Sequence, residues 1–272
     1  MRLKFWGVRG SFPVSSPSTI RYGGNTSCIE IEVADKLIIF DGGTGLYPLG
    51  KKIIAEKKYL TIHLFLTHTH LDHIAGLVNF APLYHPDFTI YIYGPKRSHI
   101  SLSDTIYRLF SNPIWPIAMD QVHAKLQWIE LCNGESVPLE QGPSISALEL
   151  DHPDSALGYR LDYADRALVY LTDLAHGPEL HMALYNFCYN ADALIYDSHF
   201  TYDEYISPKY ANWGHSCWEK GVDLSIESQV KHHFIFHHSP DRTDAQLDTI
   251  LENALIKRKQ VYIATEQFTL DL

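Results

Sequence analysis

The sequence predicts an α/β protein with mixed sheets and helices on their outer faces. Short apolar runs, rich in β-branched and aromatic residues, recur along the chain and end at glycine, proline or aspartate. Between them lie segments with apolar residues at helical spacing and lysines on the other face. No linker or low-complexity segment divides the 272 residues, of which 46% are hydrophobic. We therefore expect a single domain, residues 1–272, with a sizeable core.

The predicted elements form two rounds of strands and helices. The strands expected in the first round are 3–8, 27–33, 36–43, 61–68 and 89–95. A helix is expected at 46–58, and a second at 73–80. The second round is expected to contain strands 145–152, 157–163, 167–173, 193–200 and 233–239, followed by a helix at 243–259.

Residues 107–122, which are rich in aromatic residues and proline, are expected to form a hydrophobic cover over the sheet. The alternative is a lid in which Tyr107 or Trp115 stacks on a base.

Charge and cysteine content exclude several classes of protein. The net charge of −10 argues against a broad phosphate-binding surface, so we expect no long nucleic acid as a partner. The four cysteines are far apart and form no C-x-x-C pair, which argues against a disulfide framework and favours a reducing compartment. No stretch approaches the roughly 18 apolar residues of a membrane span, and the N-terminal segment lacks the features of a signal peptide. We therefore expect a cytoplasmic protein without a membrane partner.

The segment THTHLDHIAG, residues 67–76, follows an apolar strand and carries His68, His70, Asp72 and His73. Two histidines that are two residues apart at a strand end point to the same side, so they can bind one cation. Asp72 and His73 then lie in the turn that opens a helix, where they can face a second cation. The alternative, ordinary polar residues of a turn, does not account for four ligand-type side chains in six positions.

A metal site needs more ligands, and candidates recur at later strand ends. His152 follows one apolar strand, Asp173 ends the next, and His237 and His238 end another. A single residue of this kind is commonplace. The recurrence of such residues at successive strand ends indicates a metal centre.

In this pattern the sequence resembles the metallo-β-lactamase fold superfamily, whose first signature, H-x-H-x-D-H, is followed by a His, an Asp and a final His at successive strand ends. Within the superfamily it is most similar to the phosphodiesterase-like group of RNase Z and small cyclic phosphodiesterases. The stretches FWGVRGSFP, RYGGNTSC and FDGGTG also resemble small bacterial hydrolases of that group. The resemblance implies a four-layer αββα sandwich with a dinuclear site along one edge of the sheets.

The resemblance also implies the ligands of each metal. The implied set is His68, His70 and His152 for metal one, Asp72, His73 and His237 for metal two, and Asp173 as the bridge. His237 is preferred to His238 because only one of two adjacent strand residues can face the site. Asp41 would orient a ligand, with a turn aspartate as the equal alternative.

A further segment, NWGHSC, resembles the HST-like loop of the RNase Z-like group, with Cys217 in place of threonine. Asp197 matches an acidic residue of that group, with aspartate instead of glutamate. The hypothesis is that His215 donates a proton to the leaving oxygen or stabilises charge on the phosphate, while Asp197 orients its ring. Catalysis is thus assigned to His215, Asp197 and the metal ligand Asp72. The alternative is a loop histidine packed between Trp213 and Trp218.

These features predict a dinuclear metal-dependent hydrolase in which a metal-bridging hydroxide attacks a small phosphodiester, such as a cyclic nucleotide or a cyclic sugar phosphate. RNase Z itself is disfavoured because its bacterial members carry a tRNA-clamping arm between the motif histidine and the bridging aspartate. Here His152 and Asp173 are too close in sequence for such an arm. Zinc suits the ligands best, and manganese or iron can occupy the same set.

Two alternatives remain open. One is another enzyme of the same fold, such as a lactonase, a thioesterase or a persulfide dioxygenase. The other is a non-catalytic carrier that keeps the fold. The sequence leaves the oligomeric state open, and a homodimer is compatible with it.

Overall fold

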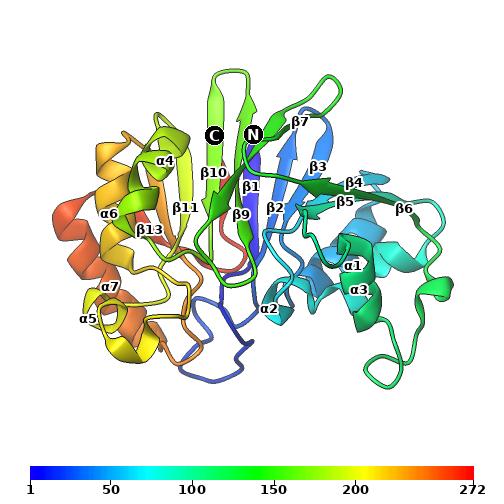
Figure 1. Cartoon of the computed structure of the whole chain (residues 1–272), viewed down its shortest axis with the longest axis horizontal. Coiled ribbons are helices and arrows are strands. Elements are labelled where there is room, and N and C mark those ends of the chain that lie inside the picture. Colours follow the sequence, from blue (N-terminus) through cyan, green and yellow to red (C-terminus); the bar gives the residue numbers. More distant parts are fainter.

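The computed structural model describes residues 1–272 and contains two seven-stranded sheets that pack face to face (Figure 1). The first sheet consists, from edge to edge, of β14 (Thr269–Asp271), β1 (Arg2–Gly7), β2 (Cys28–Val33), β3 (Lys36–Phe40), β4 (Thr61–Phe65), β5 (Thr89–Pro95) and β6 (Lys125–Leu131). The second consists of β13 (Val261–Ile263), β12 (His232–Phe236), β11 (Ala193–Asp197), β10 (Arg166–Leu171), β9 (Ala156–Tyr163), β8 (Ser144–Leu150) and β7 (Ser136–Pro138).

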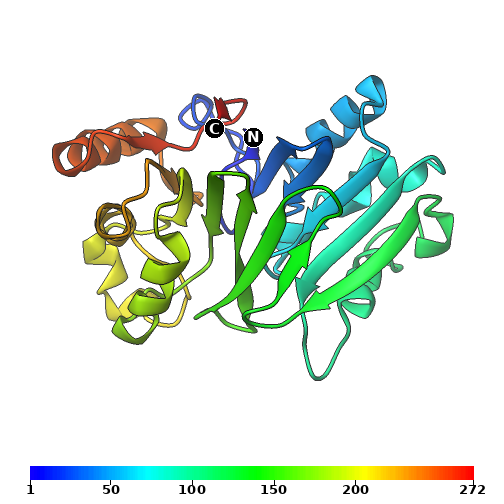
Figure 2. The same ribbon diagram turned by 90° about the horizontal axis from the view of Figure 1, so that it is seen from above.

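Helices cover the outer faces of both sheets (Figures 1 and 2). The α-helices are α1 (Leu46–Glu56), α2 (Leu71–Ile74), α3 (Leu102–Leu109), α4 (Pro178–Cys188), α5 (Tyr202–Tyr205), α6 (Trp218–Glu227) and α7 (Asp244–Lys257). Short 3₁₀ turns lie at Leu77–Asn79, Ala81–Tyr84, Met119–Gln121 and Pro208–Tyr210. Apolar residues of α1 and α3 pack on the first sheet, and those of α4, α6 and α7 pack on the second. The predicted four-layer αββα sandwich is confirmed.

Alternation along the strands explains how the layers are held together. In β3, Ile38 and Phe40 belong to the apolar cluster between the sheets, whereas Leu37 and Ile39 belong to the cluster under α1. A strand buried on both faces is a continuous apolar run, as observed in KLIIF. Across the interface, the ring of Phe40 stacks on that of Tyr170 with centroids 5.5 Å apart.

Strand direction determines where polar side chains gather. β3 to β6 run parallel to one another, as do β10 to β13. Their carboxyl ends therefore lie along one edge of the sandwich, at the bottom of Figure 1. The two chain termini lie at the opposite edge, where the amino group of Met1 donates to the carbonyl of Leu272 at 3.2 Å. Open α/β sheets place their ligand sites beyond the carboxyl ends of the strands.

All ten predicted strands are present, and several are shorter than expected. The strands expected to reach His68, Asp173 and Phe200 end at Phe65, Leu171 and Asp197. The prediction of a helix at 73–80 is wrong, because α2 ends at Ile74 and a 3₁₀ turn follows at Leu77–Asn79. The cause is the close packing of Gly76, whose N–H donates to the carbonyl of Gly42 at 2.9 Å.

The segment 107–122 covers the first sheet. Trp115 packs against the apolar cluster of that sheet, and the ring of Tyr107 lies edge-on to Trp128 of β6 at 5.7 Å. This arrangement is the hydrophobic cover that the sequence predicts. None of the helices combines the length and the apolar character that crossing a membrane requires.

Candidate metal centre

The structure brings together all seven side chains that the sequence predicts as metal ligands. Each lies just beyond the carboxyl end of a strand. His68 and His70 lie in the loop after β4, and Asp72 and His73 lie in the short helix α2 that follows this loop. His152 follows β8, Asp173 follows β10 and His237 follows β12. Six of the seven residues are buried, and His70 is half-buried. The loops meet at the edge of the sandwich defined by the parallel strands.

The first group of ligand atoms consists of imidazole nitrogens of His68, His70 and His152, with a carboxylate oxygen of Asp173 near two of them. His70 Nδ1 lies 3.2 Å from His152 Nε2. Asp173 Oδ1 lies 3.9 Å from His68 Nε2 and 3.8 Å from His152 Nε2. His68 Nε2 is buried and has no hydrogen-bond partner in the protein. An orphaned nitrogen of this kind is costly unless a ligand satisfies it.

The second group uses the other oxygen of the same carboxylate. Asp173 Oδ2 lies 3.2 Å from His73 Nε2 and 3.3 Å from His237 Nε2. Asp72 Oδ2 lies 3.2 Å and 3.4 Å from the same two nitrogens. Four ligand atoms around a tetrahedral zinc stand roughly 3.3 Å apart, given bonds of about 2.0 Å. The second group has about this spacing. The first group has suitable donor types, with ligand atoms of His68, His70 and His152 within 4.8 Å of one another.

Electrostatics holds the carboxylates in the form that binds cations. Burial raises the pKa of the Asp173 carboxyl, but the surrounding imidazoles of His237, His73 and His68 outweigh it and hold that pKa well below its usual range. Burial has the opposite consequence for His68, where it lowers the pKa of the imidazole. Ionised carboxylates and neutral imidazoles are the forms that bind metals.

Left-handed backbone turns aim several of these residues. Asp41, Asp173 and His237 have φ angles of 60°, 61° and 60°, although none is glycine. Such a conformation costs about 1 kcal/mol or more per residue, and it concentrates at functional sites. In each case the turn lies within two residues of the end of a strand.

Strand alternation is expected from the sequence to orient two pairs of histidines, and the structure shows that it is not the reason for their directions. His68 and His70 lie beyond the end of β4, and His237 and His238 lie beyond the end of β12, so a two-residue period does not govern their direction. His237 lies among the ligand atoms because of its left-handed turn. His238 lies elsewhere and donates from Nε2 to the carbonyl of Ala264 at 2.9 Å.

Asp41 lies behind the second group and fixes one of its rings. Its Oδ2 accepts from His73 Nδ1 at 2.8 Å and from the hydroxyl of Tyr170 at 2.7 Å. Its Oδ1 accepts from the N–H of Thr67 at 2.8 Å. Because Nδ1 of His73 is bonded to Asp41, Nε2 of the same ring is left to face the ligand atoms of the second group.

We expect Asp41→Asn to lower the affinity for metal about 10- to 100-fold, because the amide cannot accept from all the donors that now converge on the carboxylate. Titration against a chromophoric chelator measures the effect. Asp35→Asn is the matched control, because Asp35 is an exposed turn aspartate with φ 57°. Equal affinities in both variants would contradict the orienting role.

His215 lies beside the two groups and is held by Asp197, the last residue of β11. Its Nδ1 donates to Asp197 Oδ2 at 3.0 Å, so the shorter aspartate reaches the ring. Burial by itself lowers the pKa of His215, but the Asp197 carboxylate outweighs burial and raises that pKa. The ring is not packed between the two tryptophans, since it stacks on His199 with centroids 4.4 Å apart.

Sequence reasoning missed three parts of the site. The sequence predicts His199 within a strand, but β11 ends at Asp197, and the position of His199 two residues later in DSHF is the available signal. The N–H of Ser11 donates to Asp72 Oδ2 at 2.7 Å, and the carbonyl of Gly214 accepts from His152 Nδ1 at 2.8 Å. Backbone groups of this kind leave almost no trace in residue types.

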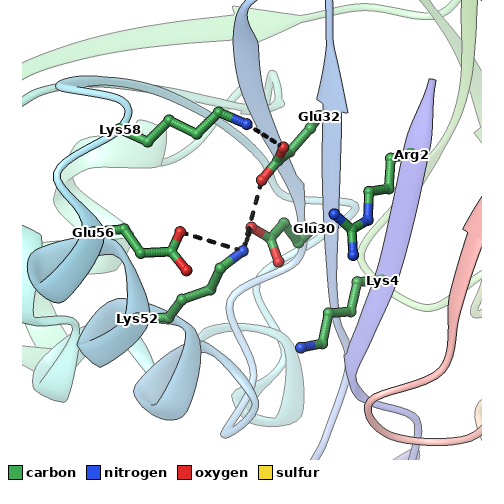
Figure 3. Close-up of a pocket in the computed structure, with 7 residues that line it drawn as sticks. All are labelled: Arg2, Lys4, Glu30, Glu32, Lys52, Glu56 and Lys58. Atoms are coloured by element: carbon green, nitrogen blue, oxygen red, sulfur yellow. Dashed lines mark hydrogen bonds and ion pairs between the residues drawn. The ribbon is translucent and has the colours of Figure 1, made fainter.

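A separate charged pocket of about 310 Å³ lies between α1 and the outer face of β1 and β2 (Figure 3). Its seven lining residues are Arg2, Lys4, Glu30, Glu32, Lys52, Glu56 and Lys58. Lys52 lies 2.6 Å from Glu30, and Lys58 lies 2.7 Å from Glu32. The pocket contains no predicted site residue, and these ion pairs neutralise much of its charge.

Comparisons with known proteins identify the family and the fold of the chain. The family described as the Beta-lactamase superfamily domain matches residues 38–238, which is most of the chain. No match was found among curated protein sequences.

Several solved structures share the fold. The metallo-beta-lactamase fold protein YhfI from Bacillus subtilis has a TM-score of 0.75 and 19% identity over 99% of this chain and 98% of that one. A diphosphatase from the PhnP family has a TM-score of 0.70 and 18% identity over 100% and 97% of the two chains. The short form of human tRNase Z has a TM-score of 0.68 and 19% identity over 100% and 99%. At these identities the likeness shows the fold alone. The family match and the shared fold confirm the resemblance read from the sequence: the chain belongs to the beta-lactamase superfamily.

Proposed function

We propose that the protein is a dinuclear metal-dependent hydrolase that cleaves a small phosphodiester, such as a cyclic nucleotide or a cyclic sugar phosphate. The observation that carries the proposal is that the two oxygens of Asp173 face two groups of ligand atoms, with His215, held by Asp197, beside them. In this proposal the chain acts as one catalytic domain. The proposed ligands are His68, His70 and His152 for one metal, Asp72, His73 and His237 for the other, and Asp173 for both.

The chemistry divides between the metals and the protein. Two divalent cations in these positions would neutralise charge on the phosphoryl oxygens and lower the pKa of a water molecule. His215 uses Nδ1 for its bond to Asp197, which leaves Nε2 to donate a proton to the leaving oxygen. The imidazole and carboxylate donors favour zinc, with manganese or iron as alternatives.

Several features support a small phosphodiester as the substrate. At a net charge of −10, attraction for phosphate must be local, and the metal groups provide it. Arg97 adds one guanidinium beside the ligand loops, where its Nη1 donates to Thr69 Oγ1 at 3.1 Å. Two of the similar structures are, by name, a diphosphatase and a tRNase Z. Between His152 and Asp173 the chain forms only the β9–β10 hairpin, without an arm that could clamp tRNA.

A substrate panel on enzyme of known metal content tests the proposal. The panel contains bis-p-nitrophenyl phosphate, cyclic nucleotides, cyclic sugar phosphates and short oligonucleotides, with lactones and thioesters as the rival substrates. We expect turnover of the small phosphodiesters. Turnover of lactones or thioesters alone would favour another enzyme of this fold, and no turnover at all would favour a carrier.

Metal binding is expected to stabilise the fold, because it gives a partner to His68 Nε2, a buried ligand atom that the chain leaves without one. Zinc at about 100 times its Kd should raise the free energy of unfolding by about 2.7 kcal/mol, which corresponds to a rise in Tm of roughly 5 °C. The rise in Tm is measured by differential scanning fluorimetry on protein that is first stripped of metal with EDTA and then given zinc. Magnesium, which prefers oxygen ligands, is the control and should give a smaller rise. Equal rises with both ions would contradict an imidazole-rich site.

A further inference from the structure

We infer that a row of aromatic rings beside His215 is the subsite for the leaving group, and that this group carries a planar ring such as a nucleobase. The inference rests on the proposed function and narrows its substrate class. We call the row the aromatic ladder, and it consists of His199, Phe200, Tyr210, Trp213 and His215.

Ring contacts connect the ladder continuously from the metal centre to the surface. The ring of His215 lies 5.2 Å from that of the proposed ligand His237. The ring of His199 stacks almost in parallel on the ring of His215. Phe200 lies edge-on to His215 at 5.9 Å. Tyr210 then lies 4.9 Å from Phe200 and 5.1 Å from Trp213.

The exposure of the rings increases along the ladder from the metal centre outward, as expected of a surface that binds a substrate. His199, Phe200 and His215 are buried, Tyr210 is half-buried, and Trp213 is 49% exposed. The inner rings are therefore fixed by packing, whereas the outermost ring presents apolar surface to solvent. An exposed aromatic ring beside a reactive centre is suited to stacking with a ligand ring.

The loop that carries the ladder is anchored to the ligand loops. The N–H of Phe200 donates to the carbonyl of Ser216 at 3.1 Å. Gly214, which directly follows Trp213, accepts from His152 Nδ1 and has φ +73°. A Cβ at Gly214 would lie 2.4 Å from that nitrogen, so the loop approaches the ligand as closely as glycine permits. The position of Trp213 is thereby tied to a proposed metal ligand.

The inner end of the ladder offers a polar group as well. His199 Nδ1 is buried and makes no hydrogen bond within the protein. Ring nitrogens of His199, His215 and His237 lie within 4.8 Å of one another. A hydroxyl of the substrate's sugar, or a phosphoryl oxygen, would supply the missing partner.

The chemistry fixes which part of the substrate lies on the ladder. In hydrolysis, the oxygen of water bonds to phosphorus, the bond from phosphorus to the ester oxygen breaks, and that oxygen takes the proton from His215. The proton released by the water then restores His215. The leaving oxygen must therefore lie within reach of His215 Nε2. The group attached to it extends along the ladder toward Trp213. Stacking of a base on an aromatic ring commonly gives about a 10-fold or larger gain in affinity, which a sugar without a base cannot obtain.

The test compares adenosine 2′,3′-cyclic phosphate with a cyclic ribose phosphate that lacks the base, on zinc-loaded enzyme. For Trp213→Ala we expect KM for the nucleotide to rise about 10-fold, while kcat/KM for the base-free substrate stays unchanged. Trp213→Phe should restore most of the affinity because it keeps a ring. The control is Tyr189→Ala, since Tyr189 is also exposed but precedes β11, at the opposite edge of the sheet.

A binding measurement gives a readout independent of turnover. Adenosine monophosphate should quench the fluorescence of Trp213, whereas ribose phosphate should not, and Trp213→Phe should remove the difference. Equal effects of Trp213→Ala on both substrates, or no selective quenching, would overturn the inference and leave the phosphodiesterase proposal in place. Failure to hydrolyse either substrate would contradict the proposed function, and selective quenching would still support the subsite.

Discussion

Replacement of Asp173 by alanine is expected to lower kcat/KM about 10³-fold or more and to reduce the bound metal. Asp173 is the side chain that reaches both ligand groups, with Oδ1 facing one and Oδ2 facing the other. Its loss would remove one ligand from each proposed metal and the negative charge between the two groups. Two-metal stabilisation of a phosphoryl transition state is worth several kcal/mol, and about 4 kcal/mol corresponds to that factor. Mass spectrometry of metal content and steady-state kinetics measure the two effects.

The neighbouring residues His237 and His238 provide a matched pair of controls. His237→Gln removes a proposed ligand, so it should lower metal content as Asp173→Ala does. His238→Gln makes the same change one residue later, where the amide can still donate to the carbonyl of Ala264. It should keep its metal. Normal metal content in both Asp173→Ala and His237→Gln, in protein with a native circular dichroism spectrum, would contradict the proposed centre.

Much of the fold could be predicted because its strands are buried on both faces. Continuous apolar runs such as KLIIF and ALVYL are visible without any knowledge of their neighbours. Helix α6 was missed because its sequence, WEKGVDLSIE, contains a glycine. That glycine is required by packing, since a Cβ at Gly221 would lie 2.4 Å from the ring of Tyr196. A tertiary contact of this kind cannot be read from local propensity.

The candidate site could be located from sequence because its residues follow strands that are parallel and end at one edge. The directions of the side chains could not be predicted, because they depend on left-handed turns at Asp173 and His237 rather than on strand alternation. The packing of segments that are distant in the sequence could not be predicted either. The aromatic segment 107–122 is prominent in the sequence, yet the exposed ring of the aromatic ladder belongs to Trp213.

Asp197 illustrates why single residues at strand ends carry more than one role. Its Oδ2 accepts from His215 Nδ1 and from the N–H of Asp173 at 2.8 Å, and its Oδ1 accepts from the N–H of His199 at 3.0 Å. One buried carboxylate thus sets the positions of the proposed proton donor, the bridging ligand and an inner ring of the ladder. Asp197→Asn is therefore a poor probe of proton transfer, because it perturbs all three.

His215→Ala is the cleaner probe and is expected to reduce kcat about 10²- to 10⁴-fold while metal content stays near normal. The ring contributes no atom to either proposed ligand group, so its removal should leave both intact. The size of the loss should depend on the leaving group. A nucleoside alkoxide needs a proton as it departs, whereas p-nitrophenolate is stable as an anion. We therefore expect a large loss with a nucleoside cyclic phosphate and a much smaller loss with bis-p-nitrophenyl phosphate.

That dependence separates proton donation from the other role open to His215, which is stabilisation of charge on the phosphate. A residue that only binds the phosphate would affect both substrates alike, because the two share the same phosphoryl oxygens. An equal loss would thus replace proton donation by charge stabilisation, and an unaltered rate would remove His215 from the mechanism. The comparison of the two substrates also tests the aromatic ladder, because the leaving group must lie beside its proton donor. If the loss were small with both substrates, His215 would not be the proton donor. Nothing in the chemistry would then place the leaving group on the aromatic ladder.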